Sequence, residues 1–157
     1  MENQIPEEHL QRAAELLEYF NNVDPFVDII LKAHLKIESM LDEIIKTFVF
    51  NQQYIDDSKL SFYQKTKIAQ AICKKSSDVI FWDVILLLNT MRNDTAHTIE
   101  NAKRNAQLVK LGELMAEDVK DYEVLSDVEK IIFTSAPVIG FLNAFLEDLK
   151  QLNEIRA

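Results

Sequence analysis

The stretch Val84-Ile-Leu-Leu-Leu88-Asn89-Thr-Met-Arg92-Asn93-Asp-Thr-Ala-His97-Thr98 lies near the middle of the chain and decides how the fold is interpreted. It opens with an unbroken apolar run, which is consistent with a buried helix. Arg92, Asn93 and His97 then bring together a cation, an amide and a titratable imidazole. On a helix Arg92 and His97 fall about 140° apart, too far for an i,i+4 contact, yet both can converge on one cleft. The stretch therefore predicts a core helix that carries a polar site.

A long helix is predicted before this stretch, from Asp24 as N-cap and Pro25 as first helical residue to about Phe50. Its apolar side chains recur at helical spacing. Leu31 and Leu35 lie outside the main stripe, and either a dimer contact or neighbours on several sides of a central helix would account for them. The positions expected to be buried are Phe26, Ile30, Ala33, Ile37, Met40 or Leu41, Ile44 and Phe48.

Capping signals and breaks place the remaining helices. Ser61 and Gln64 have the spacing of a capping box, after a loop over residues 51–58. Ser126 or Asp127 can cap a long C-terminal helix to about residue 154, which Pro137 should kink or interrupt. Further helices are expected at about residues 6–21, 61–73, 78–92 and 102–114.

The composition of the chain also favours a helical fold. Two glycines and three prolines in 157 residues, with 48% hydrophobic and 27% charged residues, favour long helices joined by short polar loops. A chain of this length can bury about two-thirds of its unfolded surface in one domain. We therefore expect an all-α, single-domain helical bundle of about five to six helices over residues 1–157, with a motif-bearing core at about 26–110.

Several functional classes are disfavoured. The single Cys73 cannot form an internal disulfide, and no ligand pattern with metal spacing includes His9 or His34, so no metal is expected. With glycines only at 112 and 140, a phosphate-binding loop and a serine-hydrolase elbow are both excluded, and no cofactor is expected. The N-terminus lacks a signal-peptide pattern and no apolar run reaches about eighteen residues, so the expected location is cytoplasmic, without a membrane partner.

Net charge is distributed unevenly along the chain. The total is −9, which taken alone disfavours nonspecific binding to nucleic acid or to an anionic membrane. Residues 59–110 nevertheless contain nine basic and four acidic residues, a net +5, which leaves −14 for the remainder. This local surplus is either a basic surface around the motif or an ordinary solvated helix face.

The pattern Arg92-Asn93-x-x-Ala96-His97 resembles the motif of the HEPN superfamily of small all-helical proteins, many of them metal-independent endoribonucleases. The order of elements over residues 26–110 is also similar to the HEPN-like branch that includes the mannitol-operon repressor family. Members of that branch have lost the catalytic pattern. In toxins silenced by nucleotidylation a tyrosine follows two residues after the histidine; here that position is Ile99, so this regulation is not expected.

The resemblance implies a catalytic set of Arg92, Asn93 and His97, an RNA substrate and a homodimer whose two motifs face one cleft. His97 would assist attack of the RNA 2′-hydroxyl on the adjacent phosphate, and Arg92 would stabilise the transition state. It also implies a role in toxin–antitoxin or phage-defence systems, with a cognate antitoxin or regulatory protein as partner. The alternative from another class is a non-catalytic regulatory or protein-interaction module.

Each motif residue also has a structural interpretation. His97 can donate to a backbone carbonyl in a helix turn, and Asn93 can cap that turn. Arg92 can form a salt bridge with Glu38, Asp94 or Glu100. The aromatic residues Phe62, Tyr63, Phe81 and Trp82 are interpreted as core rather than as surfaces that stack on bases.

Overall fold

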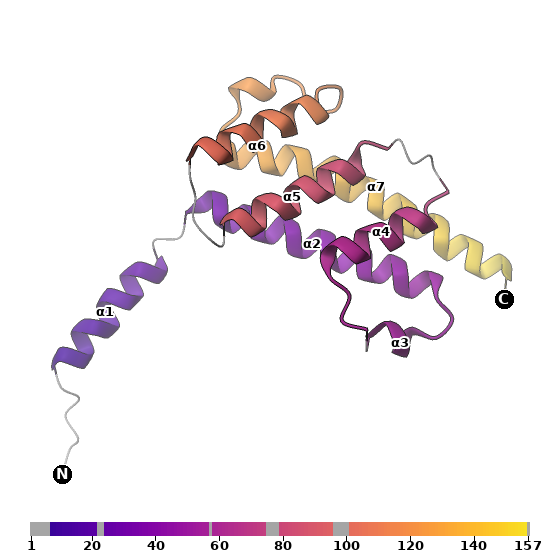
Figure 1. Ribbon diagram of the computed structural model, residues 1–157, viewed down its shortest axis with the longest axis horizontal. Coiled ribbons are helices and arrows are strands. Elements are labelled where there is room, and N and C mark those ends of the chain that lie inside the picture. Colours follow the sequence, from indigo (N-terminus) through magenta and orange to yellow (C-terminus); the bar gives the residue numbers. More distant parts are fainter. Residues whose placement is uncertain (1–6, 22–23, 57, 75–78, 96–100, 157) are drawn as a thin grey trace, which may run out of the picture.

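The structure is a computed structural model that describes residues 7–21, 24–56, 58–74, 79–95 and 101–156. Over these ranges the chain forms seven α-helices, one short 3₁₀ helix and no strand, which confirms the all-α prediction (Figure 1). The elements are α1 (Glu7–Asn21), α2 (Pro25–Phe48), α3 (Gln52–Asp56), α4 (Phe62–Ile72), α5 (Phe81–Thr95), α6 (Asn101–Leu114), η1 (Tyr122–Val124) and α7 (Asp127–Arg156).

Helix α2 lies at the centre of the bundle, with α7 alongside it and α4 and α5 packed across it (Figure 1). The two long helices run in the same direction, and their C-terminal ends lie together (Figure 1). Asn153 near the end of α7 donates to the carbonyl of Thr47 near the end of α2, at 2.7 Å. Removing their apolar side chains from water supplies most of the driving force for this packing. The fully buried side chains of α2 are Phe26, Ile30, Ile37, Leu41, Ile44 and Ile45.

The predicted helix starts are confirmed by their capping bonds. Asp24 accepts from the backbone N–H of Phe26 at 2.9 Å, and Pro25 follows it as the first residue of α2. Ser61 and Gln64 form the complete capping box that begins α4. These side chains satisfy backbone donors that the first helical turn leaves without a partner. The predicted start of the next helix, at about residue 78, lies outside the described residues.

The prediction of a loop over residues 51–58 is wrong in part, because α3 forms within it. Gln52 donates from its side chain to the carbonyl of Lys46 at 3.1 Å, and Asp56 pairs with the Lys46 ammonium at 2.7 Å. These bonds attach the one-turn helix to the end of α2. The periodic patterns used for prediction need more residues than this helix contains.

Helix α7 is continuous through Pro137, so the predicted interruption is wrong. Proline removes one intrahelical hydrogen bond. Buried side chains on both sides of it, Ile131, Val138 and Leu142 among them, hold the helix against the core and offset that loss. By length and composition α7 could also cross a membrane, a property shared by core helices of soluble bundles.

Some predicted core positions are exposed instead. Phe48, the last residue of α2, is 45% exposed. The side chains described on α1 are exposed throughout, although their spacing is that of a helix with one buried face. Phe62 and Trp82 are buried as expected, whereas Tyr63 is exposed. Periodicity therefore located the apolar faces and did not show which of them are covered.

Gly112 and Gly140 form a matched pair for testing this packing. A Cβ at Gly112 would lie 2.6 Å from the ring of Tyr122, whose hydroxyl donates to the carbonyl of Leu108 at 2.7 Å, whereas a Cβ at Gly140 would meet nothing within 4 Å. We expect Gly112→Ala to lower the free energy of unfolding by about 1–3 kcal/mol, since the ring must move. Gly140→Ala should raise it by about 0.5–1 kcal/mol, because alanine favours helix. Urea denaturation measures both changes, and equal shifts in the same direction would contradict this packing.

Candidate functional site

The polar site begins at the C-terminal end of α5. Arg92 is partly buried and Asn93 is exposed, and the Nη1 group of Arg92 donates to Oδ1 of Asn93 at 3.1 Å. The hydroxyl of Thr95 donates to the carbonyl of Arg92 at 2.7 Å, which satisfies one acceptor at the helix end. A cation in the last turn also interacts favourably with the helix dipole. The third predicted residue, His97, lies outside the described residues, so the structure brings together only the first two.

Two of the three carboxylates considered as partners for Arg92 are bonded to other groups. Glu38 accepts from the ammonium of Lys65 at 2.9 Å. Asp94 accepts from Lys103 at 2.7 Å and from Gln107 at 2.6 Å. The third carboxylate, Glu100, is outside the described residues. Within the described ranges Arg92 has no ion pair, so most of its forked donors are available to an anion.

His34 is the residue that the sequence interpretation missed. It is buried on α2, stacks on Phe62 of α4 with ring centroids 4.3 Å apart, and its Nε2 lies 3.1 Å from Oδ1 of Asn89 on α5. Asn89 is the first residue of the polar cluster, so this hydrogen bond joins α2 directly to the motif. Nδ1 of His34 is buried without a hydrogen-bond partner in the described part of the chain, and the nearest carboxylate oxygen, Oε2 of Glu38, is 3.9 Å away.

The surroundings of His34 favour the neutral imidazole. Burial lowers its pKa below the ordinary value of 6.5, and the nearby charges of Arg92 and Lys65 lower it further. The hydrogen bond to Asn89 and the charge of Glu38 act in the opposite direction without reversing the shift. Oδ1 of Asn89 can only accept a hydrogen bond. Nε2 of the neutral imidazole therefore carries the proton and donates a hydrogen bond to Oδ1.

Lys65 links α4 to α2 beside this imidazole. Burial alone would lower the pKa of Lys65, but its hydrogen bonds and charge interactions with Asp42 and Glu38 outweigh burial and raise the pKa. The ammonium lies 2.9 Å from a carboxylate oxygen of each partner. The ammonium is therefore charged, and its two carboxylate partners already balance that charge. Lys65 thus holds α4 against α2 and is not a free binding site for an anion.

Part of the local positive charge of the sequence is paired in space. Arg104 on α6 bonds to Asp24 at 3.2 Å and to Asp127 at 2.8 Å, and its guanidinium lies 3.6 Å from the ring centroid of Phe26. Lys65 and Lys103 are likewise paired with carboxylates. Carboxylates from outside residues 59–110 thus pair with two of the nine basic residues in this segment, Lys65 and Arg104. At the motif itself, the site is one half-buried arginine with an amide beside it.

The described residues include no group of three or more His, Cys, Asp or Glu side chains that could hold a metal ion. Comparisons with protein-family models, with curated proteins and with solved structures find no match to this chain. The site is therefore interpreted from its own residues. One sequence signal could have identified His34: it falls inside the apolar stripe of α2, between Ala33 and Ile37, where a buried polar group requires a partner.

The lowered pKa of His34 makes stability depend on pH. Below about pH 6.5 His34 is protonated in the unfolded chain, whereas burial favours its neutral form in the folded chain. The free energy of unfolding therefore decreases as the pH falls toward the pKa of His34 in the folded protein. One such group contributes a slope of at most about 1.4 kcal/mol per pH unit. Urea denaturation from pH 7.5 to 5.5 should show a smaller loss for His34→Gln than for wild type, whereas the exposed His9→Gln should match wild type. If the free energy of unfolding changed equally with pH in all three proteins, the lowered pKa of His34 would be contradicted.

Proposed function

We propose that this chain is a metal-independent endoribonuclease of the HEPN type, with Arg92, Asn93 and His97 as its catalytic residues. The observation that supports it most is the state of Arg92. This guanidinium is half-buried at the end of α5, bonds to Asn93, and has no carboxylate partner in the ranges described. A forked cation in that state suits a phosphodiester, whose two non-bridging oxygens can each accept a hydrogen bond.

The proposed reaction assigns one task to each residue. His97 removes the proton from the RNA 2′-hydroxyl, whose oxygen then attacks the adjacent phosphorus. The bond to the 5′-oxygen of the next nucleotide breaks, and that oxygen takes up a proton. The products are a 2′,3′-cyclic phosphate and a 5′-hydroxyl. Arg92 stabilises the negative charge that grows on the phosphoryl oxygens, and Asn93 orients the guanidinium or binds the same phosphate.

Local structure supports the placement of Arg92. The bond from His34 to Asn89 holds α5 one helical turn before the arginine, and Phe62 packs on the imidazole from α4. Because His34 and Phe62 are buried and Asn89 is partly buried, packing against the core holds α5 near its end. A site held on packed helices positions its groups better than a site held on loops alone.

The second proposal is a non-catalytic interaction module, such as a regulatory protein or one component of a toxin–antitoxin pair. Two observations favour it. The net charge of −9 opposes general binding to RNA, and α1 carries apolar side chains that are exposed to solvent. A protein partner that covers α1 would explain the exposed apolar side chains. Under either proposal the expected location is cytoplasmic.

RNA cleavage with excess EDTA tests the first proposal. Wild-type protein incubated with total RNA should give cyclic-phosphate ends, and Arg92→Ala should slow cleavage by about 10²–10³-fold, as expected for removal of a group that stabilises transition-state charge. His97→Ala should abolish it. Arg92→Lys should recover only part of the rate, because an ammonium lacks the forked geometry.

Lys110→Ala provides the matched control, since Lys110 is an exposed cation on α6 outside the site. It should cleave at the wild-type rate. Cleavage that survives both Arg92→Ala and His97→Ala would reject these residues as the catalytic set. No cleavage by purified wild type, alone or after separation from a bound partner, would favour the interaction module.

A further inference from the structure

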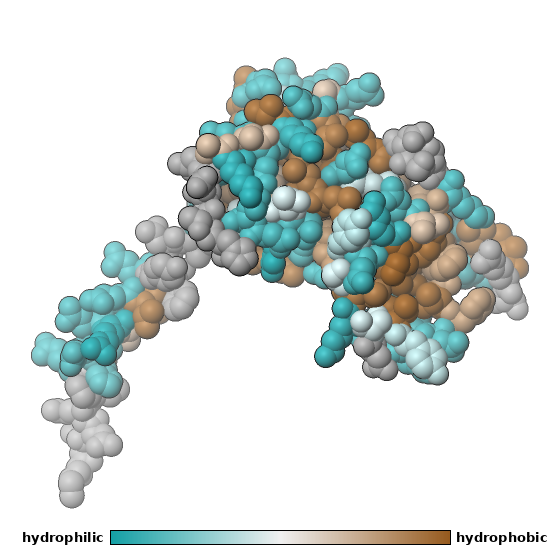
Figure 2. All heavy atoms as spheres, viewed as in Figure 1, coloured by the Kyte–Doolittle hydropathy of each residue, from teal (hydrophilic) through white to brown (hydrophobic). Residues whose placement is uncertain are grey.

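Helix α1 carries an apolar stripe that is exposed to solvent. Leu10 is 55% exposed and Leu17 is 62% exposed, and Figure 1 shows α1 standing apart from the bundle. Figure 2 shows brown apolar side chains among teal polar ones on this helix. With Ala13 and Ala14 between them, the two leucines form one stripe at three- and four-residue spacing. An isolated 15-residue helix is marginal in water, so α1 needs a surface that covers this stripe.

Helix α2 carries a second exposed apolar stripe, in its first half. Leu31 is 40% exposed and Leu35 is 54% exposed, and the two side chains lie one helical turn apart on the same face. The helices packed against α2, namely α4, α5 and α7, leave this face uncovered. Each of the two helices therefore has apolar surface that the bundle does not remove from water.

We propose that α1 folds back along α2 of its own chain as a strap, so that the two stripes close against each other in a helical hairpin. Three residues, 22–24, separate the end of α1 from the start of α2. Helices joined by about two to five residues commonly form an antiparallel hairpin. A tether this short gives α1 an effective concentration of about the millimolar range at its own α2, which favours the strap over docking on a second copy.

The two stripes are in register in such a hairpin. At about 1.5 Å per residue, Leu17 lies about 6 Å before the end of α1 and Leu10 about 17 Å before it. Leu31 lies about 9 Å after the start of α2, and Leu35 about 15 Å after it. When the chain turns back directly, Leu17 is thus nearly level with Leu31, and Leu10 with Leu35. The small side chain of Ala14 leaves room between the leucines of α1 for those of α2.

Charge on the two helices agrees with this register. Glu7 and Glu18 lie on one flank of the α1 stripe, and Lys32 and Lys36 lie on one flank of the α2 stripe. In an antiparallel hairpin with the stripes face to face, these two flanks are on the same side. Each glutamate is then within about 6 Å of a lysine along the helix axis. Lys32 bonds to Asp28 at 2.7 Å, whereas Lys36 is exposed and has no ion pair in the described part of the chain.

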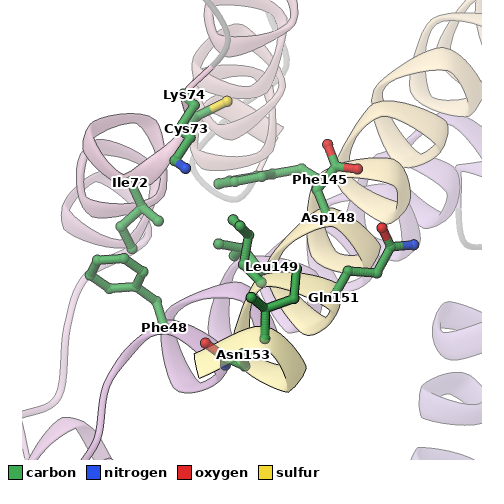
Figure 3. Close-up of a pocket in the computed structure, with 11 residues that line it drawn as sticks. Phe48, Ile72, Cys73, Lys74, Phe145, Asp148, Leu149, Gln151 and Asn153 are labelled. Atoms are coloured by element: carbon green, nitrogen blue, oxygen red, sulfur yellow. The ribbon is translucent and has the colours of Figure 1, made fainter. Parts of the chain in front are cut away.

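The largest apolar pocket near the other end of α2 is beyond the reach of this stripe. It has a volume of about 350 Å³ and lies between the C-terminal ends of α2, α4 and α7 (Figure 3). Phe48, the α2 residue that lines it, is about 35 Å from the start of α2. Even with the four residue steps from Asn21 to Pro25 fully extended, Leu10 reaches about 30 Å along α2 and Leu17 about 20 Å. The stripe can therefore cover the two leucines of α2 and not the pocket.

The strap controls access to both apolar surfaces. A protein partner that covers α1 would compete with α2 for the same stripe, so its apparent affinity would fall with the fraction of chains whose strap is open. This inference is independent of the proposed ribonuclease activity, since it involves neither Arg92 nor any other residue of that site.

Intrachain cross-linking tests the closed strap. Leu10→Cys and Leu35→Cys are combined with Cys73→Ser, which removes the only native cysteine. A short bis-maleimide is added at about 1 μM protein, far below the effective concentration of a short tether. The expected product is a single chain with the two positions joined, identified by mass spectrometry of its peptides. Arg12→Cys with Leu35→Cys is the matched control and should give little product, because Arg12 lies on the side of α1 opposite the stripe.

The proposal would be overturned by equal cross-linking through Arg12→Cys, by the absence of an intrachain product, or by a product that joins only two different chains. A second comparison pairs Leu10→Cys with Phe133→Cys, an exposed apolar position on α7. Equal cross-linking to position 133 would also overturn it, since α1 would then not be held on α2.

Hydrogen exchange gives a second measurement. The amides of α1 in the wild-type protein should exchange more slowly than those of a free peptide of residues 7–21, because docking opposes local opening of the helix. Leu31→Gln combined with Leu35→Gln should remove this protection. Because both leucines are exposed, thermal unfolding of the bundle should stay unchanged. An α1 without protection in wild type, or protection that survives in the double variant, would overturn the proposal.

Discussion

One part-buried hydrogen bond, from Nε2 of His34 to Oδ1 of Asn89 at 3.1 Å, connects the central helix to the polar stretch of α5. A buried imidazole or amide without a partner is costly, so each of these two residues fixes the position of the other. Phe62 closes the cluster from α4 by stacking on the ring. The end of α5, and with it Arg92, is therefore held by groups inside the core.

A second feature of the site is the pairing of its charges. Carboxylates from other parts of the chain pair with some of the basic residues around the motif. Lys65 binds Glu38 and Asp42, and Arg104 binds Asp24 and Asp127. Arg92 is a half-buried cation that bonds to an amide and has no ion pair in the described part of the chain. Such a site suits one phosphate held in a defined geometry better than a long nucleic-acid track, which requires many cations.

The sequence was sufficient for the fold class and for most helices, because capping residues such as Asp24 and Ser61 act locally. It was not sufficient for features that depend on distant contacts. Pro137 was tolerated because the core holds α7 on both sides of it, and α3 formed because Lys46 bonds to it. His34 was missed for the same reason, since Asn89 is 55 positions away. Arg92 and Asn93 lie beside each other because they are adjacent in the chain, and their role with His97 in one catalytic site stays a prediction.

The central claim is that Arg92, which has no ion pair in the described part of the chain, binds one phosphate. Its most direct test is the salt dependence of RNA binding. A labelled 2′-O-methyl oligonucleotide cannot undergo attack by a 2′-hydroxyl, so binding is measured without cleavage. The slope of log K against log salt concentration should become shallower by about 0.7 in Arg92→Ala, the value for one contact on a single strand. Identical slopes for wild type and Arg92→Ala, or no binding by wild type, would contradict the account.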